Sequence, residues 1–336
     1  MREVDLSKYQ VRTDLVADLI KEDYEFETKK QYKNITISNI TLTKEMEEEL
    51  ERKEGLYTTI SYNDITDKTN YKNLLDVLTQ ELKKVIEETG IKDDYSCMII
   101  GLGNEKSTAD ELGVTTAKKV TVTKHIYDLV GTLEEHFRVT TCLTPGVMGQ
   151  TGIETVEIIS SVVKQVKPDF IIAIDALASD SIDRLLKTIQ ITNTGINPGS
   201  GIGNNRKEIS NETLGIPVVE ASTIVNDTLN FMKKHFSYTI KNKNNRQNKL
   251  IETSKINYLK DNNYTLSKEE TSYFLGALGS LSNKEKKLLI NDVLTPIGYN
   301  LIVTPKEIDF IVTKLTDLLG EAINKSIHNI STKKES

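Results

Sequence analysis

Short apolar runs alternate with helical stretches through the middle of the chain, and this order constrains the fold more than any other feature. Two stretches, 108–120 and 152–165, show the three- and four-residue apolar spacing of helices. The apolar or β-branched runs around and between them predict strands at 96–100, 137–143, 170–174 and 188–192. Strands that alternate with crossover helices pair in parallel. The sequence therefore predicts an α/β core over residues 95–234, with a largely parallel sheet flanked by helices.

Residues 15–94 predict a smaller accessory region on the N-terminal side of this core. The segments 34–42 and 56–62 are rich in Ile, Thr and Tyr, which favours strands. The segment 71–88 carries leucines and valines at helical spacing. Together these patterns indicate an N-terminal β accessory layer with one helix.

Further helices are predicted at the C-terminal end of the chain. Residues 235–265 are rich in Lys and Asn and predict a solvated linker or loop, and residues 266–336 follow as a helical region. Capping boxes begin at Ser282 and Thr304, the second with proline at the first helical position. The last helix places one apolar face against the core, formed by Ile308, Ile311, Leu315, Leu318, Leu319 and Ile323.

The composition argues against several classes of function. With 43 basic and 49 acidic residues, the net charge is −6, which opposes direct binding to nucleic acid or to anionic membranes. The N-terminus lacks an apolar signal core, and no segment approaches the roughly 18 apolar residues of a membrane span. Cys97 and Cys142 lie in apolar runs, which favours buried free thiols in a reducing compartment. We therefore expect a cytoplasmic protein.

Motifs for cofactors, metals and serine chemistry are missing from the sequence. The loop that starts at Gly101 opens like a dinucleotide fingerprint, but Lys106 stands where the third glycine belongs. The four histidines and two cysteines show no zinc-site spacing, and there is no Gly-x-Ser-x-Gly elbow. The glycine-rich segments 146–152 and 199–203 favour turns, with anion binding and a substrate rim as alternatives. We expect neither a cofactor nor a metal.

Two acidic residues stand where α/β proteins place their sites, after strands of the predicted sheet. Asp110 lies in the capping box Thr108-Ala-Asp-Glu, where the helix dipole alone would favour an acid. Asp175 ends the apolar run 170–174, so it either faces a cleft or caps a following helix. On one sheet edge the two carboxylates can share a proton, so that one activates water while the other polarises a carbonyl group. The residues alone leave open whether each acid has a structural role at a helix start or a catalytic role.

Several long blocks of the chain resemble the germination protease family of spore-forming bacteria. The blocks are distributed along nearly the whole sequence, at residues 11–15, 100–104, 110–113, 145–149, 151–155, 167–178, 197–203, 294–298 and 303–307. The resemblance implies a phosphorylase/hydrolase-like α/β fold, similar to that of the hydrogenase maturation proteases. It also implies an endopeptidase of the forespore or spore core that degrades small acid-soluble spore proteins during germination.

The resemblance also assigns roles to particular residues. The family's two essential aspartates fall on Asp110 and Asp175, and its processing site falls between Asp14 and Leu15. Residues 1–14 would then be the propeptide of a self-processing zymogen, assembled as a homotetramer. The matching blocks contain no histidine for a metal site, which favours a metal-free mechanism. Two alternatives stay open: a metal-dependent maturation peptidase of the hydrogenase-processing type, and an inactive peptide-binding homologue.

One departure from the family pattern lies after residues 215–218. The family continues there through a further apolar strand, whereas this chain passes almost directly to Glu220. The shortening of about eight residues predicts a lost sheet strand, with apolar surface or unpaired backbone groups exposed near the cleft. We therefore expect lower stability or altered activity than in full-length relatives.

Overall fold

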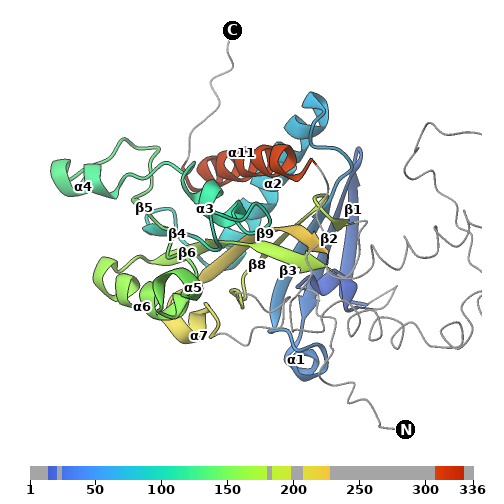
Figure 1. Cartoon of the computed structure of the whole chain (residues 1–336), viewed down its shortest axis with the longest axis horizontal. Coiled ribbons are helices and arrows are strands. Elements are labelled where there is room, and N and C mark those ends of the chain that lie inside the picture. The colour runs from blue at the N-terminus through green and yellow to red at the C-terminus, as the bar shows by residue number, and fades with distance from the viewer. Residues whose placement is uncertain (1–13, 21–24, 180–183, 198–206, 228–306, 329–336) are drawn as a thin grey trace, which may run out of the picture. The chain divides into compact units, whose positions relative to one another are not determined.

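Nine strands of the computed structural model, counted over the residues it describes, form one mixed sheet (Figure 1). The structure describes residues 14–20, 25–179, 184–197, 207–227 and 307–328. The strand order is β1-β2-β3-β8-β9-β6-β4-β5, and β7 pairs with β9 beside this path. The prediction of an α/β protein with a sheet flanked by helices is confirmed.

The parallel part of the sheet contains the predicted βα units. It consists of β4 (Cys97–Gly101), β5 (Thr140–Leu143), β6 (Phe170–Ile174), β7 (Ala176–Ser179) and β9 (Val218–Asp227). All five residues of β6 are buried, because helices cover both faces of this part and a continuous apolar run is needed there. Strand β4 lies between β5 and β6, so its C-terminal end has a parallel neighbour on each side.

The remaining strands pair antiparallel, which corrects the prediction of a largely parallel sheet. They are β1 (Glu27–Tyr32), β2 (Ile35–Leu42), β3 (Gly55–Ser61) and β8 (Thr188–Thr192), and β8 also pairs antiparallel with β9. The pairing of β3 with β8 joins the N-terminal strands to the βα units. A pairing direction of this kind depends on residues far apart in the sequence, so local patterns do not reveal it.

Residues around Glu220 form strand β9, which bears on the exposed edge expected from the shortening. It pairs with β6 and β7 on one side and with β8 on the other, so its backbone groups are satisfied within the sheet. The exposed edge predicted from the shortening is therefore absent from this described part of the sheet.

Two long helices and a short one cover one face of the sheet. They are α2 (Lys68–Glu88), α11 (Ile308–Ile327) and α3 (Leu112–Ala117), and α11 packs against both others. The predicted apolar face of α11 is confirmed: Ile311 is half-buried, and the buried members are Ile308, Leu315, Leu318, Leu319 and Ile323. The other face carries α6 (Thr155–Val166), whose Ile159 joins a second apolar cluster.

The shorter helices connect or flank these elements. They are η2 (Val16–Asp18), α1 (Lys44–Leu50), α4 (Lys124–Val130), α5 (Met148–Thr151) and α7 (Asn211–Leu214). No helix in the described ranges combines the length and apolar character needed to cross a bilayer.

Several element boundaries differ from those predicted. The helix expected at 108–120 begins only at Leu112, because residues 104–110 form hydrogen-bonded turns instead. The strand expected at 137–143 begins at Thr140, after a turn that Phe137 closes onto Glu134. The helix expected from residue 152 begins at Thr155, since Gly152 ends α5 in a left-handed conformation.

The prediction for the two cysteines is confirmed for one of them, and the predictions for the linker and the C-terminal capping boxes fall outside the described residues. Cys97 is buried as expected, whereas Cys142 is exposed, because β5 lies at the edge of the sheet. The linker at 235–265 and the capping box at Ser282 lie outside the described residues, as does Thr304. Helix α11 starts after Glu307, whose side chain makes no cap hydrogen bond.

Helix α11 ends at a buried histidine that carries a testable pH dependence. His328 Nδ1 accepts the Arg138 N–H at 3.2 Å, so the proton lies on Nε2, which donates to the Thr121 carbonyl at 3.2 Å. Burial lowers the pKa of His328, with the Arg138 charge acting in the same direction. The unfolded chain therefore binds more protons than the folded one just below pH 6.5, so stability falls as the pH drops through that range.

We expect His328→Asn to reduce this acid sensitivity. Asn keeps an acceptor for the Arg138 N–H but does not titrate. Between pH 7 and pH 5 the thermal midpoint of wild type should fall by roughly 2–4 °C more than that of the variant. The exposed His136 provides the control, because His136→Asn should follow wild type at every pH. Parallel pH curves for wild type and His328→Asn would contradict the assignment.

Candidate active site

The loop after β4 holds Asp110 in a tight turn. The Asn104 N–H donates to the Asp110 carbonyl at 3.0 Å, and the Asp110 N–H donates to Ser107 O at 2.7 Å. Gly103 has a φ of +107°, and a Cβ there would lie 2.0 Å from the Asp110 carbonyl oxygen. The sequence thus needs glycine at this position to close the turn. Asp110 is half-buried and precedes α3, so the predicted place in the first turn of a helix is wrong.

The same loop packs onto the end of β6. The Leu102 N–H donates to the Ile174 carbonyl at 2.9 Å. A Cβ on Gly113 would lie 2.2 Å from that carbonyl oxygen, so only glycine allows α3 to approach so closely. Because Gly101 and Ile174 are register partners, the residues that follow both strands lie at one edge of the sheet. The structure therefore places Asp110 and Asp175 at the same edge.

Asp175 lies directly between β6 and β7 and is 7% exposed. Its N–H donates to Ser222 Oγ at 3.1 Å, and its Oδ1 accepts the Ala176 N–H at 2.8 Å. The element that follows is a strand, so the alternative that Asp175 caps a helix is wrong. The residue is instead a buried carboxylate held between β6 and β9.

A third carboxylate, Glu220, was not predicted from the residue pattern. It lies on β9 opposite Ala173 of β6 and Thr192 of β8 and is 3% exposed. Burial raises the pKa of Glu220 to about 8; the Ser222 hydroxyl lowers it, and the charges of Asp175 and Asp14 raise it further. The available signal was an acid inside the apolar run 216–224.

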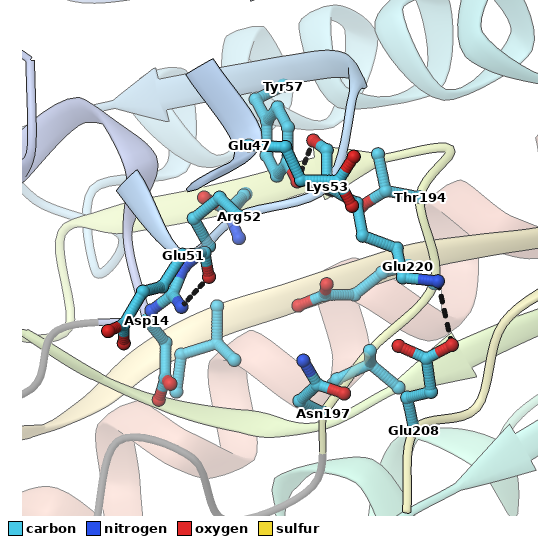
Figure 2. Close-up of a pocket in the computed structure, with 14 residues that line it drawn as sticks. Asp14, Glu47, Glu51, Arg52, Lys53, Tyr57, Thr194, Asn197, Glu208 and Glu220 are labelled. Carbon is cyan, nitrogen blue, oxygen red and sulfur yellow. Dashed lines mark hydrogen bonds and ion pairs between the residues drawn. The ribbon is translucent and has the colours of Figure 1, made fainter. Parts of the chain in front are cut away.

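Glu220 lines a cavity of about 270 Å³ (Figure 2). The lining comes from six separate segments of the chain and comprises Asp14, Glu47, Glu51, Arg52, Lys53, Tyr57, Leu177, Gln190, Thr194, Gly195, Ile196, Asn197, Glu208 and Glu220. The predicted catalytic pair, Asp110 and Asp175, is not part of this lining. Asp175 is nevertheless adjacent to the cavity, because Ser222 hydrogen-bonds to both Asp175 and Glu220.

The predicted processing site is docked against β7. The Asp14 N–H donates to Ala178 O at 2.8 Å, and Asp14 Oδ2 accepts the Ala178 N–H at 2.9 Å. Leu15 and Val16 are fully buried. The structure therefore brings the bond between Asp14 and Leu15 close to Glu220, with both sides of that bond held in place.

The next residues fasten this arm further. Asp18, whose side chain is 5% exposed, pairs with Arg184 Nε at 2.6 Å and accepts a hydrogen bond from Ser179 Oγ at 2.7 Å. Across the described ranges, His, Cys, Asp and Glu side chains nowhere converge in threes or more in a way that could hold a metal ion.

Comparisons with known proteins agree with the sequence blocks described above. The family model described as germination protease matches residues 9–336. The germination proteases of Bacillus pumilus (strain SAFR-032) and Priestia megaterium (strain ATCC 12872 / QMB1551) are each 38% identical over 357 residues. These alignments cover 97% and 98% of this chain, respectively, and 96% of each relative. The germination protease of Bacillus mycoides (strain KBAB4) is 38% identical over 354 residues.

Proposed function

This chain belongs to the germination protease family, and we propose on that basis that it is an endopeptidase that starts the degradation of small acid-soluble spore proteins during germination. The observation that carries the proposal is the position of Asp175. A carboxylate that is 7% exposed at the end of a fully buried strand is costly unless it serves the site at that edge.

The mechanism we propose uses Asp110 and Asp175 as a carboxylate pair. One carboxylate takes a proton from water, whose oxygen attacks the peptide carbonyl carbon. The other, protonated, polarises the carbonyl and then donates its proton to the nitrogen as the C–N bond breaks. The shared sheet edge and the loop that packs onto Ile174 support this assignment.

The proposal includes a zymogen. Residues 1–14 would be a propeptide that the enzyme itself removes by cleavage between Asp14 and Leu15. The contacts of the arm with β7, next to β6 and Asp175, support it. The homotetramer, the location in the spore core and the fold similarity to hydrogenase maturation proteases complete the proposal and rest on the family resemblance.

Digestion of a purified small acid-soluble spore protein tests this function. The chain is first held at mildly acidic pH to allow processing and is then mixed with substrate, with and without EDTA. We expect defined endoproteolytic products by mass spectrometry, at a rate that EDTA leaves unchanged. Loss of cleavage in EDTA would favour the metal-dependent maturation peptidase. Binding without cleavage in either buffer would favour the inactive peptide-binding homologue.

A further inference from the structure

The Glu220 side chain points into the cavity, toward the side lined by Asp14 and Arg52 (Figure 2). It is 3% exposed, and its Oε1 has no hydrogen-bond partner within the described structure. A buried carboxylate oxygen without a partner is strongly unfavourable when ionised. An unsatisfied acceptor of this kind, aimed into a cavity, indicates a group that is absent from the unprocessed chain.

The charges around the cavity indicate that this group is a cation. Among the described residues, five acidic and two basic side chains line the cavity. Lys53 already pairs with Glu208 at 2.7 Å and Glu212 at 2.6 Å. Arg52 donates to the backbone carbonyl of Glu51 at 2.9 Å. Its positive charge stays on the side where Glu220 points and acts on Glu220, but Asp14 and Glu51 lie on that side as well (Figure 2). An acidic excess therefore remains there.

Residues 14–16 run along the wall of this cavity. Asp14 and Gln190 both line it, and the Val16 N–H donates to Gln190 Oε1 at 3.2 Å. The Leu15 side chain packs in the same apolar cluster as Leu177 and Ile196, which are also lining residues. Leu15 thus lies between Asp14, which lines the cavity, and Val16, which hydrogen-bonds to the lining residue Gln190.

We propose that this cavity binds a primary ammonium group and that cleavage between Asp14 and Leu15 supplies it as the α-ammonium group of Leu15. The inference rests on the processing step of the proposed function. Hydrolysis adds water across the bond: the hydroxyl group forms the new carboxyl group of Asp14, and the Leu15 nitrogen gains the other proton of the water. The carboxyl group then ionises, and its proton converts the Leu15 amine to the ammonium group. Departure of residues 1–14 removes the Asp14 charge, and the new cation pairs with Glu220 Oε1.

This ion pair would make Glu220 a positioning residue for the site. The Ser222 hydroxyl hydrogen-bonds to Glu220 and accepts the Asp175 N–H at 3.1 Å. Before cleavage, Glu220 faces the carboxylates of Asp14 and Asp175. After cleavage it faces an ammonium group, so its ionised form is stabilised and the hydrogen bond from Ser222 strengthens. Cleavage between Asp14 and Leu15 would thereby alter the hydrogen bonds of Ser222, which contacts the backbone of Asp175.

The unprocessed full-length chain tests the site without any cleavage. Methylammonium chloride at pH 9, where Glu220 is ionised, should raise the thermal midpoint by roughly 2–4 °C over equal NaCl. Glu220→Gln should lose this response. The control Glu81→Gln should keep it, because Glu81 also has a buried carboxylate oxygen without a hydrogen-bond partner in the described structure, Oε2, but does not line the cavity. Wild type and the two variants are compared at one pH, because other titratable or charged side chains also face this region. These are Asp14, Asp175, Arg52, Tyr57 and Lys53.

Equal responses of wild type and Glu220→Gln to methylammonium would overturn the ammonium site. A rise with MgCl₂ but not with methylammonium would also overturn it, in favour of a divalent cation.

The processed chain tests the source of the ammonium group. We expect the α-amino group of Leu15 to react with acetic anhydride at least about tenfold more slowly in processed wild type than in processed Glu220→Gln. The ion pair with Glu220 stabilises the protonated form of the amino group, and only the unprotonated form attacks the anhydride. Peptide mapping gives the rates. Equal rates would show that Leu15 is not the source of the ammonium group. A lysine side chain of the substrate would then be the group that the cavity binds. If no chain begins at Leu15, the processing proposal fails, and the methylammonium result alone decides the site.

Discussion

Replacing either Asp110 or Asp175 with Asn is expected to abolish peptidase activity and to leave a folded chain. Asn has nearly the same volume, and its Oδ1 can still accept the Ala176 N–H that Asp175 binds at 2.8 Å. What it loses is the proton that a carboxyl group exchanges during hydrolysis. The loss of a general acid or base costs roughly 10²–10⁴ in rate. Digestion of a spore protein gives the rate, and circular dichroism melting reports the fold.

Asp169 offers a matched control for Asp175, because the two residues flank the same strand, β6. It lies just before β6, at the opposite end, where it is exposed and accepts hydrogen bonds from Ser96 N–H and Oγ at 2.7 and 2.6 Å. Asp169→Asn should melt slightly lower than wild type but digest substrate at the wild-type rate. Near wild-type digestion by Asp110→Asn or Asp175→Asn would show that the paired-carboxylate mechanism is wrong.

The parts of the fold that could be predicted are those whose environment is uniform along the segment. Strands β6 and β8 match their predicted bounds, and every residue in each is buried. The sequence of β6 is an uninterrupted apolar run, whereas β8 alternates isoleucine with Thr188, Gln190 and Thr192. The face of α11 was predictable for a similar reason, since helical spacing alone decides which residues meet the core. In both cases the local pattern contains the information.

The features that could not be predicted depend on contacts between distant segments. The antiparallel junction of β3 with β8 joins residues 57–61 to residues 188–192. The packing of α3 onto the end of β6 depends on the close approach of Gly113 to Ile174. Glu220 reads as an ordinary interruption of an apolar run until β6 and β8 bury it. The cavity is lined by six separate segments of the chain, so no local pattern predicts it.

The buried arm leads to the second large effect, on the rate of self-processing. Leu15 and Val16 are fully buried and the backbone of Asp14 is bonded to Ala178, so we infer that the arm must leave β7 before the bond between Asp14 and Leu15 is cleaved. The pair between Asp18 and Arg184 helps to hold it. Arg184→Gln leaves a nearly buried carboxylate without this cation, at a cost of roughly 1–2 kcal/mol to the docked state.

We therefore expect Arg184→Gln to shorten its own chain about tenfold faster than wild type, because 1.4 kcal/mol corresponds to a factor of ten in the opening equilibrium. Terminal sequencing over time at mildly acidic pH measures the rate of appearance of chains that begin at Leu15. Lys29→Gln is the control, since Lys29 pairs with Glu27 but is 61% exposed and lies outside the arm. Adding Asp110→Asn to Arg184→Gln should stop processing, which excludes a contaminating protease. An unchanged rate in Arg184→Gln would mean that the bond is cut without release of the arm, and the catalytic carboxylates would then have to reach it in its docked position.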